Sequence, residues 1–207
     1  MPKIIVNLQY DYHRAMALEN KLLDRFSRTL NLELPVLDTM DEYLDTIIPL
    51  VRPWGEDLYE EEYYLDTRWL EVRDDDSFHE AVLHIFGEGG EYLLSIDGNI
   101  HKGKWRKLDR SNTLILEQTA GTAVVKSELY DLAFLNKDFF ILKKHGDQQR
   151  KGFKKYFVLS RESYVRGLEW RDVMELLFNR YRNNSRWIIF VTVVVLIVAV
   201  FVFFSVF

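Results

Sequence analysis

The sequence predicts a mainly β-structured domain with helical additions, followed by one membrane-spanning helix. Two observations carry this prediction. Between residues 68 and 160, short runs of β-branched and aromatic residues alternate with turn signals about every 8–12 residues. From Trp187 to Phe207 the chain carries no charged residue, proline or glycine. Hydrophobic residues make up 48% of the chain and aromatic residues 14%, which is enough to bury a core and argues against general disorder.

The β-rich part divides into eight predicted strands with short connections. Asp97-Gly98 is a strong hairpin signal, and the glycines at 87, 89 and 90 supply the positive φ that a tight connection needs. Because every connection is short, each strand is expected to pair with the next. Eight consecutive antiparallel strands favour closure into an up-and-down barrel, which removes exposed edges. The predicted strands are residues 68–73, 80–86, 92–96, 100–108, 113–117, 123–129, 139–143 and 155–159.

Three helices are predicted outside the strands. Residues 11–30 carry apolar side chains at helical spacing, and a short helix is expected over 39–48, with Asp38 as its cap and Pro49 as its end. A third helix is expected over 168–181. Its apolar face consists of Trp170, Val173, Met174, Leu177 and Tyr181.

An acidic and aromatic stretch, residues 54–66, precedes the strands. It fits a linker or an arm packed on the domain, and alternatively a motif that binds a partner. The predicted organisation is therefore an accessory segment (1–66), a β-barrel domain (67–162), an amphipathic juxtamembrane helix (163–186) and a transmembrane helix (187–207).

The apolar tail is long enough to cross a bilayer. As a helix, residues 187–207 would extend roughly 30 Å, the thickness of the hydrocarbon core. Arginines at 180, 182 and 186 precede the tail, so the positive-inside rule predicts a cytoplasmic N-terminal part at the inner membrane of a bacterium. The apolar run near Met1 is too short for a signal peptide, which predicts a tail-anchored, single-pass protein. The expected anchor residues are Trp187, Phe190, Leu196, Phe201 and Phe204.

A family resemblance rests on the centre of the β-rich part. An aromatic residue, a glycine turn, a G-x-W motif and a Leu-rich strand follow one another, carried by Phe86, Gly90, Tyr92, Gly103, Trp105, Leu114, Ile115 and Leu116. This order resembles the lipocalin-like (calycin-type) domains of small bacterial proteins, over about residues 68–160. The resemblance implies a barrel that ends in a packed helix. The family has no shared catalytic set, so the resemblance implies no functional residue.

Motifs for catalysis, cofactors and metals are missing from the sequence. The chain has no cysteine, which excludes disulfides, thiolate metal sites and cysteine nucleophiles. No two of the five histidines have HxH or HxxxH spacing, and neither a phosphate-binding glycine loop nor a G-x-S-x-G elbow occurs. We therefore predict a protein that is not an enzyme, with no cofactor and no metal.

Charge is distributed unevenly along the chain. Acidic residues dominate residues 1–100, and basic residues dominate residues 101–207. The basic half is expected either to contact anionic headgroups or an acidic protein segment, or to neutralise the acidic half within one fold. Nucleic-acid binding is not expected of an acidic protein held at a membrane. The candidate contact residues are Lys102, Lys104, Arg106, Lys151, Lys154 and Lys155.

The function predicted from these features is that of a tail-anchored membrane adaptor or assembly subunit. Its cytoplasmic β-domain is expected to recruit a protein partner at the bilayer. The alternative is a membrane-tethered sensor that holds one small ligand inside the barrel, since eight-stranded barrels have room for one. The barrel interior distinguishes the two predictions. A solid apolar core favours the adaptor, and a pocket with convergent polar groups favours the sensor.

Overall fold

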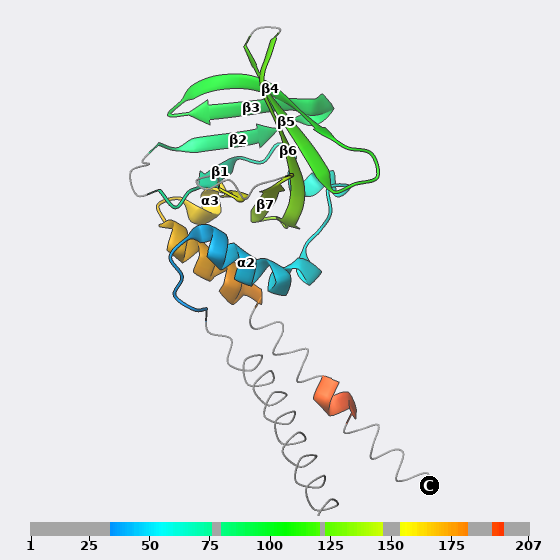
Figure 1. Cartoon of the computed structure of the whole chain (residues 1–207), viewed down its shortest axis with the longest axis vertical. Coiled ribbons are helices and arrows are strands. Elements are labelled where there is room, and N and C mark those ends of the chain that lie inside the picture. Colours follow the sequence, from blue (N-terminus) through cyan, green and yellow to red (C-terminus); the bar gives the residue numbers. More distant parts are fainter. Residues whose placement is uncertain (1–33, 76–79, 121–122, 147–153, 182–191, 197–207) are drawn as a thin grey trace, which may run out of the picture. The chain divides into compact units, whose positions relative to one another are not determined.

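The computed structural model describes residues 34–75, 80–120, 123–146, 154–181 and 192–196. The chain divides into two units, residues 36–181 and residues 1–35 with 182–207. All strands and packed helices described below belong to the first unit (Figure 1).

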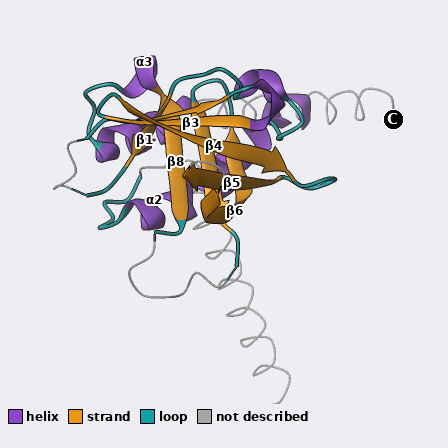
Figure 2. Cartoon of the chain, turned by 90° about the horizontal axis from the view of Figure 1, so that it is seen from above, coloured by secondary structure: helices purple, strands orange, loops and turns teal. Residues whose placement is uncertain are grey.

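Eight antiparallel strands form a closed barrel in the order of the sequence, as the sequence predicts. Each strand pairs with the next, and the last returns to pair with the first (Figures 1 and 2). The strands are β1 (Trp69–Val72), β2 (Val82–Phe86), β3 (Glu91–Ile96), β4 (Asn99–Lys107), β5 (Thr113–Ala120), β6 (Ala123–Leu135), β7 (Phe139–Lys144) and β8 (Tyr156–Arg161).

The β3–β4 connection is the tight hairpin that its Asp-Gly signal predicts. Asp97 and Gly98 both have left-handed backbone, with φ of 48° and 88°. Two consecutive positive φ values define the turn whose twist matches that of the flanking strands. A second short connection, the 3₁₀ turn η3 (Glu88–Gly90), joins β2 to β3 and also contains positive-φ glycines.

Strand β6 runs six residues beyond its predicted end at Leu129. No glycine or proline interrupts residues 130–135, and a register shift between Leu132 and Phe134 lets the strand continue against β7. The shift places Leu132 and Leu135 in the barrel core. Phe134 instead meets the ring of Tyr181, at 5.6 Å between centroids.

Helix α2 (Met40–Val51) differs from its prediction at both ends. Its N-cap is Thr39 rather than Asp38, because the Thr39 hydroxyl and the Glu42 side chain form a reciprocal capping box. The helix also passes through Pro49 instead of stopping there. Ile47, Ile48 and Val51 are all buried, so packing carries the helix through the last turn, where one missing N–H is tolerated. The turn η1 (Arg52–Trp54) follows.

The predicted C-terminal helix is present over residues 170–181, and its predicted apolar face is buried throughout. It lies beside α2 at one end of the barrel (Figure 1). The two helices meet where Tyr43 contacts Trp170 edge to face, at 5.6 Å between ring centroids. The short helix α3 (Glu162–Val165) connects β8 to this layer.

The acidic and aromatic stretch, residues 54–66, is an arm packed on the domain. This was one of the interpretations that its sequence allowed. Leu58 and Tyr64 are fully buried, and the Tyr64 ring packs on Trp105 and Phe140 at 5.6 Å and 5.3 Å. The arm contains the turn η2 (Glu61–Tyr63). Lys107 fixes it by donating to Glu61 at 2.6 Å. The arm thereby closes one end of the barrel interior with aromatic side chains.

The predicted tail and N-terminal helix fall largely outside the described residues. Residues 1–33 and four of the five predicted anchor residues, Trp187, Phe190, Phe201 and Phe204, are among those not described. Residues 192–196 are helical, and Leu196 is exposed. Among the helices that the described residues form, none has the length and apolarity needed to cross a bilayer. The membrane span stays a prediction.

Candidate functional site

A cavity of about 470 Å³ occupies part of the barrel interior. The large aromatic side chains that pack around the arm do not line it, whereas Val82, Leu94 and Leu116 belong both to the buried core and to the cavity wall. Apolar side chains from several strands form part of its wall, namely Val82, Leu94, Ile96, Leu116 and Phe157. Its charged lining consists of Glu71, Arg73, Asp75, Lys126, Glu128, Lys144 and Lys154.

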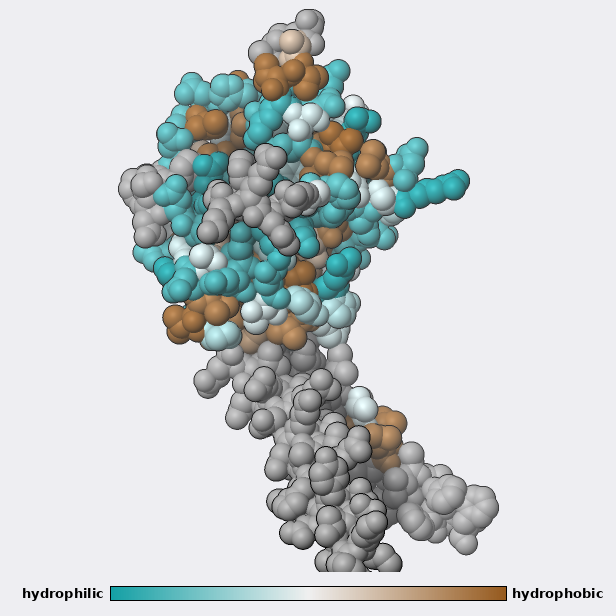
Figure 3. Space-filling model, viewed as in Figure 1, coloured by the Kyte–Doolittle hydropathy of each residue, from teal (hydrophilic) through white to brown (hydrophobic). Residues whose placement is uncertain are grey.

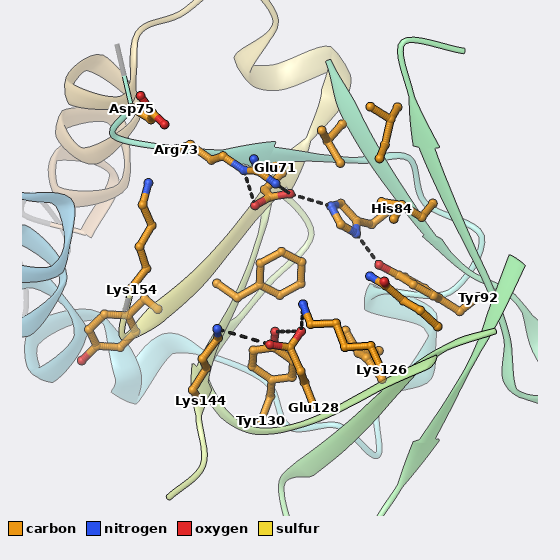
Figure 4. Close-up of a pocket in the computed structure, with 17 residues that line it drawn as sticks. Glu71, Arg73, Asp75, His84, Tyr92, Lys126, Glu128, Tyr130, Lys144 and Lys154 are labelled. Carbon is orange, nitrogen blue, oxygen red and sulfur yellow. Dashed lines mark hydrogen bonds and ion pairs between the residues drawn. The ribbon is translucent and has the colours of Figure 1, made fainter. Parts of the chain in front are cut away.

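The first polar cluster in the cavity is centred on the Glu71 carboxylate of β1 (Figure 4). Arg73 donates from Nε and Nη2 to the two carboxylate oxygens at 2.6 Å and 2.8 Å. His84 Nε2 lies 3.1 Å from Oε2 of Glu71, and His84 Nδ1 lies 2.6 Å from the Tyr92 hydroxyl. A carboxylate only accepts, so Nε2 carries the hydrogen, and Nδ1 of a neutral ring accepts from Tyr92.

This cluster keeps Glu71 charged despite its burial. Burial acts to raise the pKa of Glu71, but the hydrogen bonds from His84 and Arg73 outweigh it and lower the pKa to about 2. Burial raises the pKa of Tyr92, so its hydroxyl stays protonated and able to donate. Consecutive hydrogen bonds therefore link Tyr92, His84 and Glu71 along the cavity wall.

The second polar cluster is centred on Glu128 of β6. Lys126 and Lys144 lie 2.8 Å and 3.3 Å from its two oxygens, and the Tyr130 hydroxyl donates at 3.0 Å. Burial acts to raise the pKa of Glu128, but the two lysines and the tyrosine lower it overall. Figure 4 shows this cluster facing the first across the cavity.

Strand alternation places both clusters inside the barrel. Successive side chains on a strand point to opposite faces, so Glu71 and Arg73 share the inward face of Trp69. Strand register then brings His84 of β2 to the Glu71 cluster. Trp69 is the partner of His84 in the β1–β2 pair, so the two side chains share the inward face. The polar cavity is therefore a consequence of register as well as of sequence.

Gly103 of β4 makes room for the ring of Tyr92. A Cβ atom at residue 103 would lie 2.8 Å from Cδ1 of Tyr92 and 2.3 Å from the carbonyl oxygen of Glu117. Both distances are shorter than a van der Waals contact. The glycine of the predicted G-x-W motif thus has a steric role beside the cavity.

We expect Gly103→Ala to lower the free energy of unfolding by about 1–3 kcal/mol, because overpacking next to backbone has few ways to relax. Chemical denaturation of the full chain measures the change. Gly87→Ala is the matched control, since its Cβ would meet its nearest neighbour at 3.4 Å, an ordinary contact. Equal stability of the two variants would show that the β4 backbone shifts freely.

The predicted basic residues do not form one group. Lys102, Lys104 and Arg106 are exposed on β4, and Arg106 lies 3.9 Å from Glu117. Lys154 lines the cavity and pairs with Asp74 at 2.6 Å, whereas Lys155 contacts Asp45 of α2. Lys151 lies outside the described residues.

Sequence reasoning missed the residues of both polar clusters. In the sequence, the spacing of the five histidines bears only on metal binding, and no carboxylate stands out among the 32 acidic residues. A usable signal existed, since Glu71 and Arg73 follow Trp69 at alternate positions of one predicted strand, and a tryptophan there is expected to point inward. Charged residues on the inward face of a predicted strand indicate a polar interior.

In the described part of the chain, no three potential metal ligands from His, Asp or Glu lie together. Comparisons of the chain with protein families, with curated proteins and with solved structures found no match. The cavity itself is therefore the main guide to function.

Proposed function

We propose that the barrel binds one small molecule in its polar cavity, and that the chain is a membrane-tethered sensor of that molecule. The observation that supports the proposal is the convergence of two polar clusters on a cavity of about 470 Å³. Small-molecule sites typically enclose roughly 300–1,000 Å³ and combine an apolar wall with a few placed polar groups.

The polar side chains argue against a purely structural interior. Burying Glu71 and His84 costs free energy that an apolar pair of similar volume would not cost. His84 is 3% exposed and sits on the inward face of a barrel whose other end is packed with aromatic rings. A polar arrangement of this kind is expected where it serves recognition. We also propose kinship with the lipocalin-like domains that the sequence resembles, whose barrels enclose ligands.

The proposal is tested by purifying the full chain from its native membranes and analysing the bound material by mass spectrometry, for small molecules and for proteins. A sensor is expected to carry one small molecule in near-stoichiometric amount. A preparation that carries no small molecule, after several independent purifications, would contradict the proposal.

A second candidate function is the adaptor predicted from the sequence, and the exposed face of β4 favours it. Lys102, Lys104 and Arg106 are exposed on that strand. A cationic surface of this kind suits an acidic segment of a partner or anionic lipid headgroups.

We expect the double substitution Lys102→Glu and Lys104→Glu to reduce a captured partner at least tenfold if the β4 face recruits it. The melting temperature is expected to stay within about 2 °C, because exposed substitutions change stability little. Lys137→Glu, at an exposed position in the β6–β7 turn, is the control. Retention of all captured proteins by the double variant would exclude the β4 face as the binding surface.

A further inference from the structure

The charges around the cavity balance one another. Its lining contains four cationic and three acidic side chains, namely Arg73, Lys126, Lys144, Lys154, Glu71, Asp75 and Glu128. Lys154 pairs with Asp74 at 2.6 Å, and this carboxylate supplies the fourth negative charge. Because the His84 ring is neutral, the group as a whole carries no net formal charge.

The fold also holds these charges in pairs. Arg73 donates two hydrogen bonds to Glu71. Lys126 and Lys144 lie 2.8 Å and 3.3 Å from the two carboxylate oxygens of Glu128. A charged group on a ligand would lose hydration on entering the cavity, and it would have to compete with an existing pair for a counter-ion. An uncharged ligand avoids both costs.

The lining also contains one amide side chain, that of Gln118 on β5. An amide carries both a hydrogen-bond acceptor and a donor. Within the described part of the chain, the Gln118 amide has no hydrogen-bond partner. The Tyr92 and Tyr130 hydroxyls, in contrast, already donate to His84 and Glu128. Gln118 is therefore the uncharged polar group that a ligand can bind without displacing another bond.

Strand register places Gln118 in one row with Tyr92. Gly103 of β4 is the partner of Tyr92 on β3 and of Gln118 on β5, and partners in a pair share a face of the sheet. The Tyr92 ring lies over the glycine, where a Cβ atom would be 2.8 Å from its Cδ1. No side chain of β4 therefore stands between Tyr92 and Gln118 in this row.

The wall next to Gln118 is apolar. Leu116 lies two positions before Gln118 on β5, so both side chains point into the barrel. Leu94 and Leu116 are 9% and 6% exposed, and both line the cavity together with Phe157. A ligand that covered this wall would bury hydrocarbon, at a gain of roughly 25 cal/mol per Å² of apolar surface.

Resting on the small-molecule binding proposed above, we propose that the ligand is an uncharged molecule with an apolar body and a hydroxyl head. The Gln118 amide holds the head, accepting a hydrogen bond at its oxygen or donating one from its nitrogen. The body packs against Leu94, Leu116 and Phe157. The paired charges around the cavity discriminate against charged analogues of the same shape.

The proposal is tested with three probes of one shape, 4-phenylbutan-1-ol, 4-phenylbutanoate and 4-phenylbutylamine, by isothermal titration calorimetry at neutral pH. The full chain is held in nanodiscs of neutral phosphatidylcholine, and empty nanodiscs serve as the blank. We expect the alcohol to bind about tenfold more tightly than either the acid or the amine. A charged head brings a desolvation cost that a balanced lining does not offset.

Matched variants locate the site. Gln118→Leu is expected to weaken binding of the alcohol about fivefold, the effect of one neutral hydrogen bond. Ser127→Leu introduces the same side chain at an exposed position on β6 and is expected to leave binding unchanged. Leu116→Trp fills the apolar part of the cavity and is expected to abolish binding of the alcohol.

A charge variant tests whether the balanced lining sets the selectivity. Lys126→Met leaves the lining with one excess negative charge. The affinity for the amine is therefore expected to rise about fivefold, the effect of one partly exposed ion pair, while the affinity for the alcohol stays the same. Lys102→Met, at an exposed position on β4 outside the cavity lining, is the control.

The contradicting results separate the two proposals. If the acid or the amine binds as tightly as the alcohol, and Leu116→Trp removes that binding, the cavity is a ligand site but the uncharged class is wrong. An alcohol affinity unchanged by Gln118→Leu would show that the head is not where we place it, and an amine affinity unchanged by Lys126→Met would show that the lining charges do not select the ligand. If none of the three probes binds, or if Leu116→Trp has no effect on a probe that does, the cavity site itself is contradicted.

Discussion

Replacing Trp69 by alanine is expected to lower the free energy of unfolding by about 3–5 kcal/mol, the largest single effect that the fold predicts. The side chain is fully buried, its Nε1 donates to the Tyr64 carbonyl at 3.0 Å, and its ring packs on Phe140 at 5.8 Å. The truncation therefore opens a cavity and also removes the bond that ties the arm to β1. Chemical denaturation of the full chain, followed by circular dichroism, measures the loss.

Such a loss is a large part of the total stability of a domain of this size, so the alanine variant alone risks giving an unfolded chain. Trp69→Phe keeps most of the ring volume and is expected to lose roughly half as much. Ile100→Ala is the control, because Ile100 is 67% exposed on β4. If Trp69→Ala and Ile100→Ala unfold at the same denaturant concentration as the parent, the tryptophan is not in the core.

Glu71→Gln is expected to lower the free energy of unfolding at neutral pH by about 3 kcal/mol. The folded pKa of Glu71 is about 2, against an ordinary value of 4.5. Each unit of pKa shift corresponds to about 1.4 kcal/mol, so the shift supports a loss of this order. The amide would remove the carboxylate that accepts two hydrogen bonds from the Arg73 guanidinium.

The pH dependence of this effect has a defined sign. A carboxyl group whose pKa is lowered by folding stabilises the fold at pH values above its unfolded pKa. That contribution falls as the pH drops from about 4.5 to about 2. The stability difference between parent and Glu71→Gln is therefore expected to shrink over this window. Glu91→Gln, at an exposed position on β3, is the control. A difference that stays constant down to pH 2 would mean that Glu71 is not held by its partners.

The strand order was predictable because its signals are local. Turn signals such as Asp97-Gly98 lie between runs of β-forming residues, and short connections leave each strand only its neighbour to pair with. The buried face of the helix at 170–181 was predictable for the same reason, since helical spacing decides which side chains share a face. Local sequence patterns were therefore enough to predict the strand order of the barrel.

The candidate site was not predictable, because its contacts depend on non-local register. Glu71 and His84 meet through the pairing of β1 with β2, and Lys144 reaches Glu128 across β6 and β7. Local signals also failed where packing outweighed them. Pro49 lies inside α2 because buried residues continue on both sides of it. The extension of β6 to Leu135 similarly depends on a register shift that no turn residue marks.

Native mass spectrometry of the full chain released from detergent micelles shows whether the barrel interior holds a small molecule. We expect a species heavier than the 24.7 kDa polypeptide by the mass of one small molecule. The added mass should be lost on collisional activation and missing from Leu116→Trp, yet retained by Ile100→Trp, which adds the same indole at an exposed position. A parent chain found only at the polypeptide mass, or an added mass that Leu116→Trp retains in full, would rule out a ligand in the barrel cavity.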